Sequence, residues 1–250
     1  MDIRFLYSSS SGNSTIIYDD QTTLIIDAGI SYKKLVEAND GDVPIIDAIF
    51  VTHEHSDHIS GLGVLGRKTK AVIFIPERSY EKIKNTLKGC KINFIKGGDT
   101  YKIGSLNVSA FSTRHDSLES VGYTVQNESS KYGHVTDTGV MTAVVTDAIQ
   151  DCNALFIETD YDYYALDEYE EYDDVLKARI QSSTGHLSNQ QVIKYLIKEA
   201  NFQQLEWVML GHLSPRTNSP DILNKLLTKY IPAEKLAKIN IFTEPKTISI

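Results

Sequence analysis

One short stretch of this sequence is rich in side chains that bind metal ions. From Val51 to Gly63 the chain reads Val-Thr-His-Glu-His-Ser-Asp-His-Ile-Ser-Gly-Leu-Gly. It places four candidate ligands within six residues: His53, His55, Asp57 and His58. Alternate side chains of an extended backbone share one side, so the first two histidines can reach one ion. The chain then turns, and the other two ligands can reach a second ion. A plain solvated loop would rarely combine these residue types at this spacing.

Three more candidate ligands follow, each at the expected end of a strand: His115, Asp137 and His212. Strand ends on one edge of a sheet sandwich converge, so all seven ligands could share one cleft. They divide sensibly into two sets and one bridge: His53, His55 and His115 on one ion, Asp57, His58 and His212 on the other, and Asp137 between the ions. Imidazole and carboxylate ligands without thiolate suit Zn²⁺ or Mn²⁺, with iron as a further possibility.

Two such ions would give the chain hydrolytic chemistry. When they lie about 3.5–4 Å apart, they lower the pKa of water and hold a bridging hydroxide near neutral pH. That hydroxide is a nucleophile. The ligand pattern therefore predicts a hydrolase with two bound divalent ions.

Two other polar segments could support this site. The loop Ser8–Ser14 is suited to holding an oxyanion, and its candidate substrate-binding residues are Ser11, Asn13 and Ser14. A plain polar hairpin is the alternative. Asp27 ends the expected strand 22–29, where its carboxylate could hold a ligand histidine from behind. It could equally cap the helix expected at 32–38.

The elements that position these residues follow from hydrophobic patterning. An apolar, β-branched strand is expected at 45–51, and a helix starting at 59–62 would have Asp57 as its cap. Further strands are predicted at 3–7, 15–18, 71–75, 92–95, 106–111, 121–126, 143–146, 154–157, 205–210 and 239–242. A hairpin turn is expected over 127–134. Further helices are predicted at 79–87, 189–199 and 220–229, the second of these with Ser188 as its N-cap.

Residues 158–174 are rich in tyrosine, aspartate and glutamate. We interpret most of this segment as a solvated helix face with its tyrosines on the core, rather than as a binding surface.

The overall composition suits one globular domain over residues 1–250. Strands followed by helices occur twice, which indicates an α+β protein with a sheet-on-sheet core flanked by helices. No apolar run reaches roughly 18 residues, so no membrane span is expected. The absence of a signal-peptide pattern and the presence of only two cysteines, Cys90 and Cys152, indicate a cytoplasmic protein with free thiols. The net charge of −8 does not suggest nucleic-acid binding. It does not exclude such binding, because bound cations invert the local charge of a site.

The motif His53-x-His55-x-Asp57-His58, with the three later ligands, resembles the metallo-β-lactamase superfamily over nearly the whole chain. This resemblance implies a four-layer αβ/βα sandwich with a binuclear site at its top edge. Antibiotic-cleaving members usually place cysteine where this chain has Asp137. A bridging aspartate is the pattern of the phosphodiesterases, nucleases, glyoxalases and lactonases.

Several short segments resemble one bacterial branch of that superfamily, the YycJ/WalJ-like proteins, which are associated with DNA exonuclease activity. These segments are 10–14, 26–29, 61–65, 136–139, 185–189 and 210–214. The branch is similar in layout to RNase Z and to a cyclic phosphodiesterase of phosphonate metabolism. Similarity to RNase Z implies that Glu158 holds and polarises His186. That histidine would stabilise the scissile phosphate or protonate the leaving oxygen. The alternative is that His186 only begins a helix.

These observations favour a binuclear phosphodiester hydrolase, a nuclease of the exonuclease type acting on DNA, with Asp57, His186 and Glu158 as catalytic residues. The chain lacks a β-CASP insert and a long glycine- and proline-rich arm, and residues 160–174 are acidic, which counts against a long duplex substrate. A small-molecule phosphodiesterase acting on cyclic nucleotides or cyclic phosphates is the alternative. A metal-binding regulatory protein with a vestigial site is a third reading, and the presence of all seven ligands argues against it. The oligomeric state stays open, with a dimer as one option.

Overall fold

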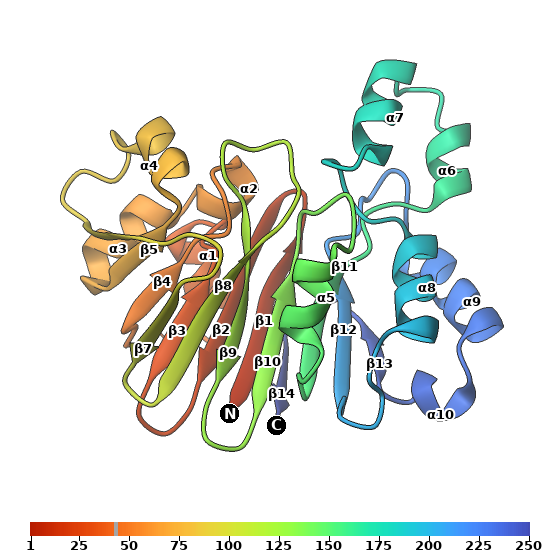
Figure 1. Cartoon of the computed structure of the whole chain (residues 1–250). Coiled ribbons are helices and arrows are strands. Elements are labelled where there is room, and N and C mark those ends of the chain that lie inside the picture. Colours follow the sequence, from red (N-terminus) through yellow and green to blue (C-terminus); the bar gives the residue numbers. More distant parts are fainter. Residues whose placement is uncertain (43–44) are drawn as a thin grey trace. The chain divides into compact units, whose positions relative to one another are not determined.

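The computed structural model describes residues 1–42 and 45–250, which form two compact units. Unit 1 comprises Met1–Ser112, Ser117–Ser130 and Glu244–Ile250. Unit 2 comprises Thr113–Asp116 and Lys131–Thr243. Each unit combines strands with helices (Figure 1). No helix in the described part of the chain is long and apolar enough to cross a membrane. Cys90 and Cys152 are both free thiols.

Unit 1 contains a seven-stranded sheet in the order β14-β1-β2-β3-β4-β5-β6. The pairs among β14, β1, β2 and β3 are antiparallel, and those from β3 to β6 are parallel. The bounds are β1 Asp2–Ser9, β2 Gly12–Tyr18, β3 Thr23–Ile26, β4 Ala48–Phe50, β5 Val72–Ile75, β6 Lys91–Phe94 and β14 Lys246–Ser249.

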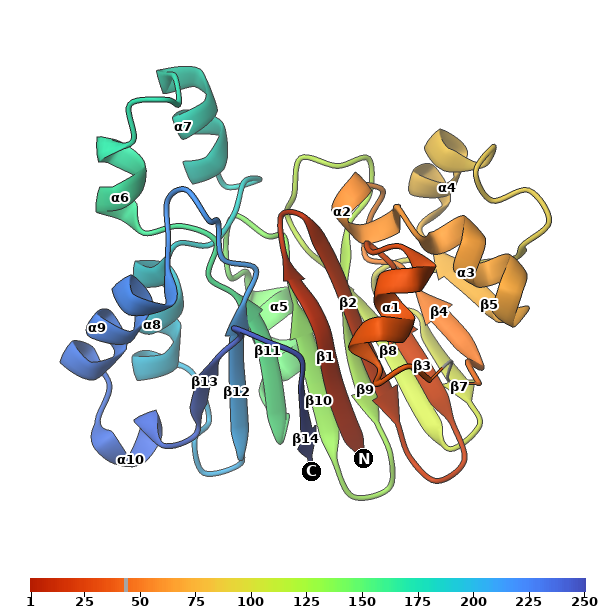
Figure 2. The same cartoon turned by 180° about the vertical axis from the view of Figure 1, so that it is seen from behind.

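The centre of this sheet is apolar on both faces. Ile49 and Phe50 are neighbours on β4, so they point to opposite faces, and both are fully buried. Such two-sided burial is typical of a parallel strand that helices cover. Ile49 packs in one core cluster with Leu35 and Leu65, which come from the helices α1 (Tyr32–Ala38) and α3 (Leu62–Thr69). Figure 2 shows α1 against a face of this sheet.

Two capping predictions for unit 1 are wrong. Ser31 caps α1 by accepting a hydrogen bond from the Lys34 backbone N–H, so Asp27 does not cap this helix. Asp57 lies within α2 (Ser56–Ile59), and His55 occupies the N-cap position. The chain enters α2 earlier than expected, immediately after His55, so the Asp57 carboxylate is left for other contacts.

The remaining strands of unit 1 form an antiparallel ribbon: β7 Thr100–Ile103, β8 Leu106–Ser112 and β9 Val121–Gln126. The hydroxyl of Tyr123 on β9 donates to the Val51 carbonyl at 2.5 Å. This bond connects the ribbon to the chain that leaves β4 for the ligand stretch. The last helix of unit 1 is α4 (Glu77–Ile83).

Unit 2 contains four parallel strands in the order β13-β12-β11-β10. Figures 1 and 2 show α8 and α9 side by side along these strands, with α6 and α7 together beyond the strand ends. The strands are β10 Lys131–Val135, β11 Ala154–Glu158, β12 Trp207–Gly211 and β13 Ile239–Ile241. The helices are α5 Ala143–Ile149, α6 Tyr163–Glu168, α7 Asp174–Gln181, α8 Asn189–Lys198, α9 Pro220–Tyr230 and α10 Ala233–Leu236.

The predicted strand at 143–146 is wrong, because this segment begins α5. The Thr142 side chain caps the helix by accepting from the Val145 backbone N–H. Val145 and Ile149 are buried four residues apart, whereas Val144 is 56% exposed. This spacing makes an amphipathic helix, so packing overrides the β-branched composition of the segment.

Other differences concern the ends of elements and the tyrosines. The expected turn over 127–134 is shorter, because β10 begins at Lys131. Tyr161 is buried as expected, but Tyr163 and Tyr164 are exposed, so the prediction that the tyrosines of this segment lie on the core is wrong for these two. The strands β7 and β14 and the helices α7 and α10 were not predicted; α7 has eight residues and the other three have four.

Helix α8 begins with a capping box, as its sequence suggests. The Ser188 side chain accepts from the Gln191 backbone N–H at 3.2 Å, and the Gln191 side chain accepts from the Ser188 N–H at 2.8 Å. Replacing Ser188 with alanine leaves a helix donor unsatisfied, so we expect a loss of about 1 kcal/mol in the free energy of unfolding, measured by urea denaturation. Ser188→Thr keeps the acceptor and is the control. Equal stability of Ser188→Ala and the unchanged protein would contradict this role.

Candidate metal centre

The candidate site residues form two sets, one in each unit, and most lie just beyond the end of a strand. The set of unit 1 comprises Asn13, Asp27, His53, His55, Asp57 and His58. The set of unit 2 comprises His115, Asp137, Glu158, His186 and His212.

In unit 1 a buried carboxylate fixes the His58 ring. Asp27 Oδ2 lies 2.7 Å from His58 Nδ1. The Thr52 backbone N–H and hydroxyl also donate to this carboxylate, each at 2.8 Å. Burial raises the pKa of Asp27 above its ordinary value, and His58 and Thr52 oppose this rise. A carboxylate on Nδ1 sets the ring orientation and makes Nε2 the ligand atom.

The other candidate ligands of this stretch gather around His58. The His53 ring centroid is 4.2 Å from that of His58 and 4.6 Å from that of His55. Asp57 Oδ2 lies 3.2 Å from His58 Nε2, and the Asn13 amide nitrogen is 3.2 Å from each of these two atoms. Three imidazoles and one carboxylate thus lie side by side, which is a donor set suited to a divalent transition metal.

Helix α2 is held by the chain that follows Asp27. The Ala28 N–H donates to the His58 carbonyl at 2.9 Å, and the Ala28 carbonyl accepts from the Gly61 N–H at 2.8 Å. The Ser60 hydroxyl donates to the Gly29 carbonyl at 2.6 Å. A Cβ atom at position 29 would lie 1.5 Å from the Asp57 carbonyl oxygen, so only glycine allows this approach.

Sequence reasoning missed the role of Glu54, which lies between two candidate ligands. Its buried carboxylate accepts from the Ser79 hydroxyl at 2.7 Å, the Leu118 N–H at 3.0 Å and Lys82 Nζ at 3.2 Å. Burial alone would raise the pKa of Glu54, but these donors outweigh it and the pKa is lowered. Glu54 therefore anchors the stretch while its neighbours are left as ligands. Its partners are distant in sequence, so spacing gave no signal.

In unit 2 three imidazoles surround the Asp137 carboxylate. Asp137 Oδ1 lies 3.6 Å from His115 Nε2, 3.8 Å from His212 Nε2 and 3.5 Å from His186 Nδ1. The Gly185 carbonyl lies 3.1 Å from His115 Nδ1, which orients this ring with its Nε2 toward Asp137.

The second buried carboxylate of the site is Glu158. Its Oε1 accepts from the backbone N–H groups of Thr138 at 2.7 Å and Leu187 at 3.2 Å, and its Oε2 lies 3.0 Å from His186 Nδ1. Burial lowers the pKa of His186, but the charge and hydrogen bond of Glu158 raise it more, to about 10. The contact with Glu158 therefore favours the imidazolium form of His186, whose side chain is 22% exposed.

One group within unit 2 could hold a metal ion by itself. Asp137, Glu158, His186 and His212 bring potential ligand atoms within 4.8 Å of one another, but His186 could bind an ion only after losing its proton. Sequence reasoning did not single out Asp160, whose Oδ1 is 3.7 Å from His212 Nδ1. Burial raises the pKa of Asp160 to about 6. Its position two residues after Glu158, at the end of the same strand, was a signal that could have indicated it.

Three site residues share an uncommon backbone conformation. Asp27, Asp137 and His212 have φ values of +59°, +51° and +54°, and each lies within two residues of the end of a strand. Residues other than glycine seldom adopt this left-handed region, and holding them there costs free energy. The turns thus aim these side chains at the expense of local stability.

The expected loop Ser8–Ser14 is mostly strand. β1 runs to Ser9 and β2 begins at Gly12, so only Ser10 and Ser11 form the turn. Ser11 is exposed in this turn, whereas Asn13 and Ser14 are buried. Among these predicted substrate-binding residues, Asn13 faces the ligands Asp57 and His58.

Comparisons with known proteins agree with this geometry. A family model described as a beta-lactamase superfamily domain matches residues 22–201. The exodeoxyribonuclease WalJ of Streptococcus pneumoniae serotype 2 (strain D39 / NCTC 7466) is 30% identical over 235 residues, which cover 90% of this chain and 86% of WalJ. The exodeoxyribonuclease YycJ of Bacillus anthracis is 30% identical over 226 residues, which cover 87% of this chain and 84% of YycJ.

A solved structure shows the same fold. The metallo-beta-lactamase fold protein YhfI of Bacillus subtilis superposes with a TM-score of 0.75 at 16% identity, and the match covers 99% of each chain. The predicted fold class, an αβ/βα sandwich, is therefore confirmed, and so is the resemblance that the ligand motif indicated.

The close approach at Gly29 gives a test of the unit 1 set. In Gly29→Ala the new methyl group meets the Asp57 carbonyl and, at 2.7 Å, the Asn13 backbone nitrogen, so α2 must move. We expect a loss of about 3 kcal/mol or more in the free energy of unfolding, because the clash is with backbone. Gly98→Ala is the control, since Gly98 has open space and a φ of +97°. It should cost only about 1 kcal/mol from backbone strain. Equal losses of unfolding free energy in the two variants would show that the close approach of Gly29 to α2 does not matter for stability.

The left-handed conformation of His212 gives a second test. His212→Gly and His212→Ala both remove the imidazole, but only glycine relieves the strained φ. We expect the glycine variant to be more stable by about 1 kcal/mol in urea denaturation with a chelator present. The chelator removes any contribution from bound metal. A more stable alanine variant would show that position 212 is not strained.

Proposed function

This chain belongs to the metallo-β-lactamase superfamily, and from that membership we propose that it is a metal-dependent phosphodiester hydrolase acting on DNA as an exonuclease. The observation that carries the proposal is the 30% identity over about nine-tenths of the chain to two proteins named exodeoxyribonucleases. The bridging position of aspartate at residue 137, rather than cysteine, supports a phosphodiester over a β-lactam substrate.

In this proposal two divalent ions bind the seven ligands as the sequence predicts. His53, His55 and His115 would hold one ion, Asp57, His58 and His212 would hold the other, and Asp137 would be shared between them. The donor chemistry supports it, since the buried clusters contain imidazole and carboxylate groups and no thiolate. Zn²⁺ and Mn²⁺ both suit such ligands. The ions would activate a water molecule and neutralise charge on the phosphate.

His186 supplies the acid in this reaction. The contact with Glu158 raises the pKa of His186, which favours its protonated form, and fixes its ring. An imidazolium can stabilise the scissile phosphate and give its proton to the leaving oxygen. Glu158 acts through His186 as a positioning residue. Asn13 could assist at the substrate, because its amide is already directed at the Asp57 side chain.

One observation favours a smaller substrate. Six acidic residues in the segment that includes α6 and α7 are exposed: Asp167, Glu168, Glu170, Glu171, Asp173 and Asp174. Their charge would repel a long polyanion that passed near them. A cyclic nucleotide or another small cyclic phosphate is therefore the second candidate substrate.

The proposed substrate is tested with purified protein and Mn²⁺. Labelled single- and double-stranded DNA, RNA, 2′,3′-cyclic nucleotides and bis(p-nitrophenyl) phosphate are supplied in parallel. We expect release of mononucleotides from DNA ends, because an exonuclease removes one residue at a time. Turnover of the cyclic nucleotides with no cleavage of any polymer would contradict the nuclease proposal and support a small cyclic phosphate as the substrate.

Two variants separate the proposed roles. Asp57→Ala should lower the metal content and abolish turnover, since Asp57 is a ligand of one ion. His186→Ala should keep the metal content of the unchanged protein but lose about 10²–10⁴-fold in rate, because only the proton donor is removed. Metal content is measured by atomic emission on the same samples. A full rate in His186→Ala would refute its role, and full activity in Asp57→Ala would refute the binuclear mechanism.

A further inference from the structure

Helices α6, α8 and α9 of unit 2 enclose an apolar groove of about 300 Å³. Its apolar wall is formed by Tyr164, Ile193, Ile197, Leu226 and Tyr230. Three of these side chains are well exposed: Ile197 is 41% exposed, Tyr230 49% and Tyr164 69%. Contiguous exposed apolar residues of this kind mark interaction surfaces more often than single ones do.

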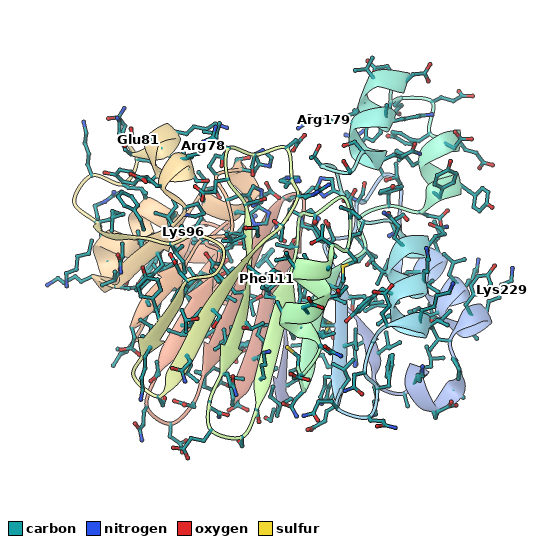
Figure 3. All side chains as sticks on the ribbon, in the orientation of Figure 1. Arg78, Glu81, Lys96, Phe111, Arg179 and Lys229 are labelled. Carbon is teal, nitrogen blue, oxygen red and sulfur yellow. The ribbon has the colours of Figure 1, made fainter. Side chains whose placement is uncertain are left out.

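The edge of this groove is basic. Lys194 and Lys198 line it directly, and Lys225 and Lys229 follow on α9. Lys194, Lys198 and Lys225 form no ion pair with any residue that the structure describes. Lys229 lies over the Tyr230 ring at 4.8 Å, and Figure 3 shows it on the outer side of α9. In a chain of net charge −8, lysines at the edge of an apolar groove would attract an acidic ligand.

The same unit carries a segment with the opposite charge. The arm, residues 163–181, contains α6 and α7 and the six exposed acids named above. Its Tyr164 also lines the groove, so the two surfaces adjoin on α6. Leu166 is the only residue buried within these two helices. Tyr163 and Val175 are 50% and 79% exposed, so apolar side chains accompany the acids on its surface.

Polar contacts hold the arm in place without covering it. Arg216 donates to the Tyr169 hydroxyl at 3.0 Å and lies 3.2 Å from the Glu171 carboxylate. Arg179, labelled on α7 in Figure 3, donates to the Asp116 carboxylate. The arm is thus already ordered, and a partner that bound it would not have to order it first.

We propose that the arm of one copy of this chain binds the groove of a second copy. Each chain carries both surfaces, so a twofold-symmetric dimer forms the same contact twice and closes on itself. The acids of the arm face the lysines of the groove, and exposed apolar residues on both surfaces lose water. A second copy is preferred to an unrelated acidic ligand because this chain itself supplies the complementary charge. The inference does not rest on the metal chemistry proposed above.

The test uses charge reversal of the full chain and sedimentation equilibrium at low salt. One chain has a mass of 28.0 kDa, and the unchanged protein should sediment with twice that mass. Lys194→Glu with Lys198→Glu cancels the positive charge of the groove, and Glu168→Lys with Glu170→Lys removes most of the negative charge of the arm. In each variant one of the two surfaces loses its charge, so we expect the dimer dissociation constant to rise about tenfold or more.

Mixing the two variants gives the sharpest result. The unchanged acidic arm of one variant then meets the unchanged basic groove of the other, a pairing that neither variant can form with itself. Equal amounts should form a heterodimer, detected by native mass spectrometry with a tag on one variant. High salt should weaken the unchanged dimer, because it screens these charges. Lys88→Glu with Lys102→Glu changes the net charge equally but lies in unit 1, and this control should dimerise like the unchanged protein.

Three outcomes would overturn the proposal. The first is an unchanged protein that stays monomeric at several hundred micromolar, even if the groove then binds another acidic ligand. The second is a groove variant that dimerises as tightly as the control while circular dichroism shows it folded. The third is a mixture that contains no heterodimer. If either glutamate variant fails to fold, Lys194→Gln with Lys198→Gln removes the charge with less perturbation, and it should still weaken the dimer.

Discussion

The buried carboxylate of Asp27 is the interaction on which the ligand stretch of unit 1 depends. Removing a charged group from water is costly unless it is fully hydrogen-bonded. Here the Thr52 N–H, the Thr52 hydroxyl and His58 Nδ1 satisfy it. Because the chain turns through a left-handed conformation at Asp27, the next two residues reach α2 and clamp it. One carboxylate thereby fixes both a ligand ring and the helix that carries it.

In unit 2 a second buried carboxylate is stabilised in the same way. Glu158 is fully buried at the end of β11, and it also has three donors: the N–H groups of Thr138 and Leu187, and His186 Nδ1. In each unit a carboxylate thus lies at or just after the end of a strand. Two backbone or hydroxyl donors hydrogen-bond to it, and an imidazole is its third partner. The imidazoles are oriented before any ion or substrate binds, which is what pre-organised catalysis requires.

Sequence reasoning succeeded where one residue's role depends on its near neighbours. Ser188 and Gln191 predict the start of α8 because both partners of the capping box lie within one turn. The candidate ligand histidines stand out because their spacing is local, and their role as ligands stays a prediction. Glu54 was missed because its partners are 25 and 64 residues away. The segment that forms α5 was misjudged because its β-branched residues favour strands, and only the burial of Val145 and Ile149 decides for a helix. The left-handed turns that aim Asp137 and His212 leave no mark in a single sequence.

The distribution of charge bears on the substrate more than the net value of −8 does. Six of the acids that produce this value are exposed on the arm, and unpaired lysines lie beside the groove of the same unit. If the arm binds the groove of a second copy, these acids and lysines neutralise one another. Pairing leaves the net charge of the two chains unchanged, but the acids of the arm would no longer be exposed to a passing DNA strand. The acidic segment would in that case be an argument for self-association, and it would no longer count against a polymeric substrate.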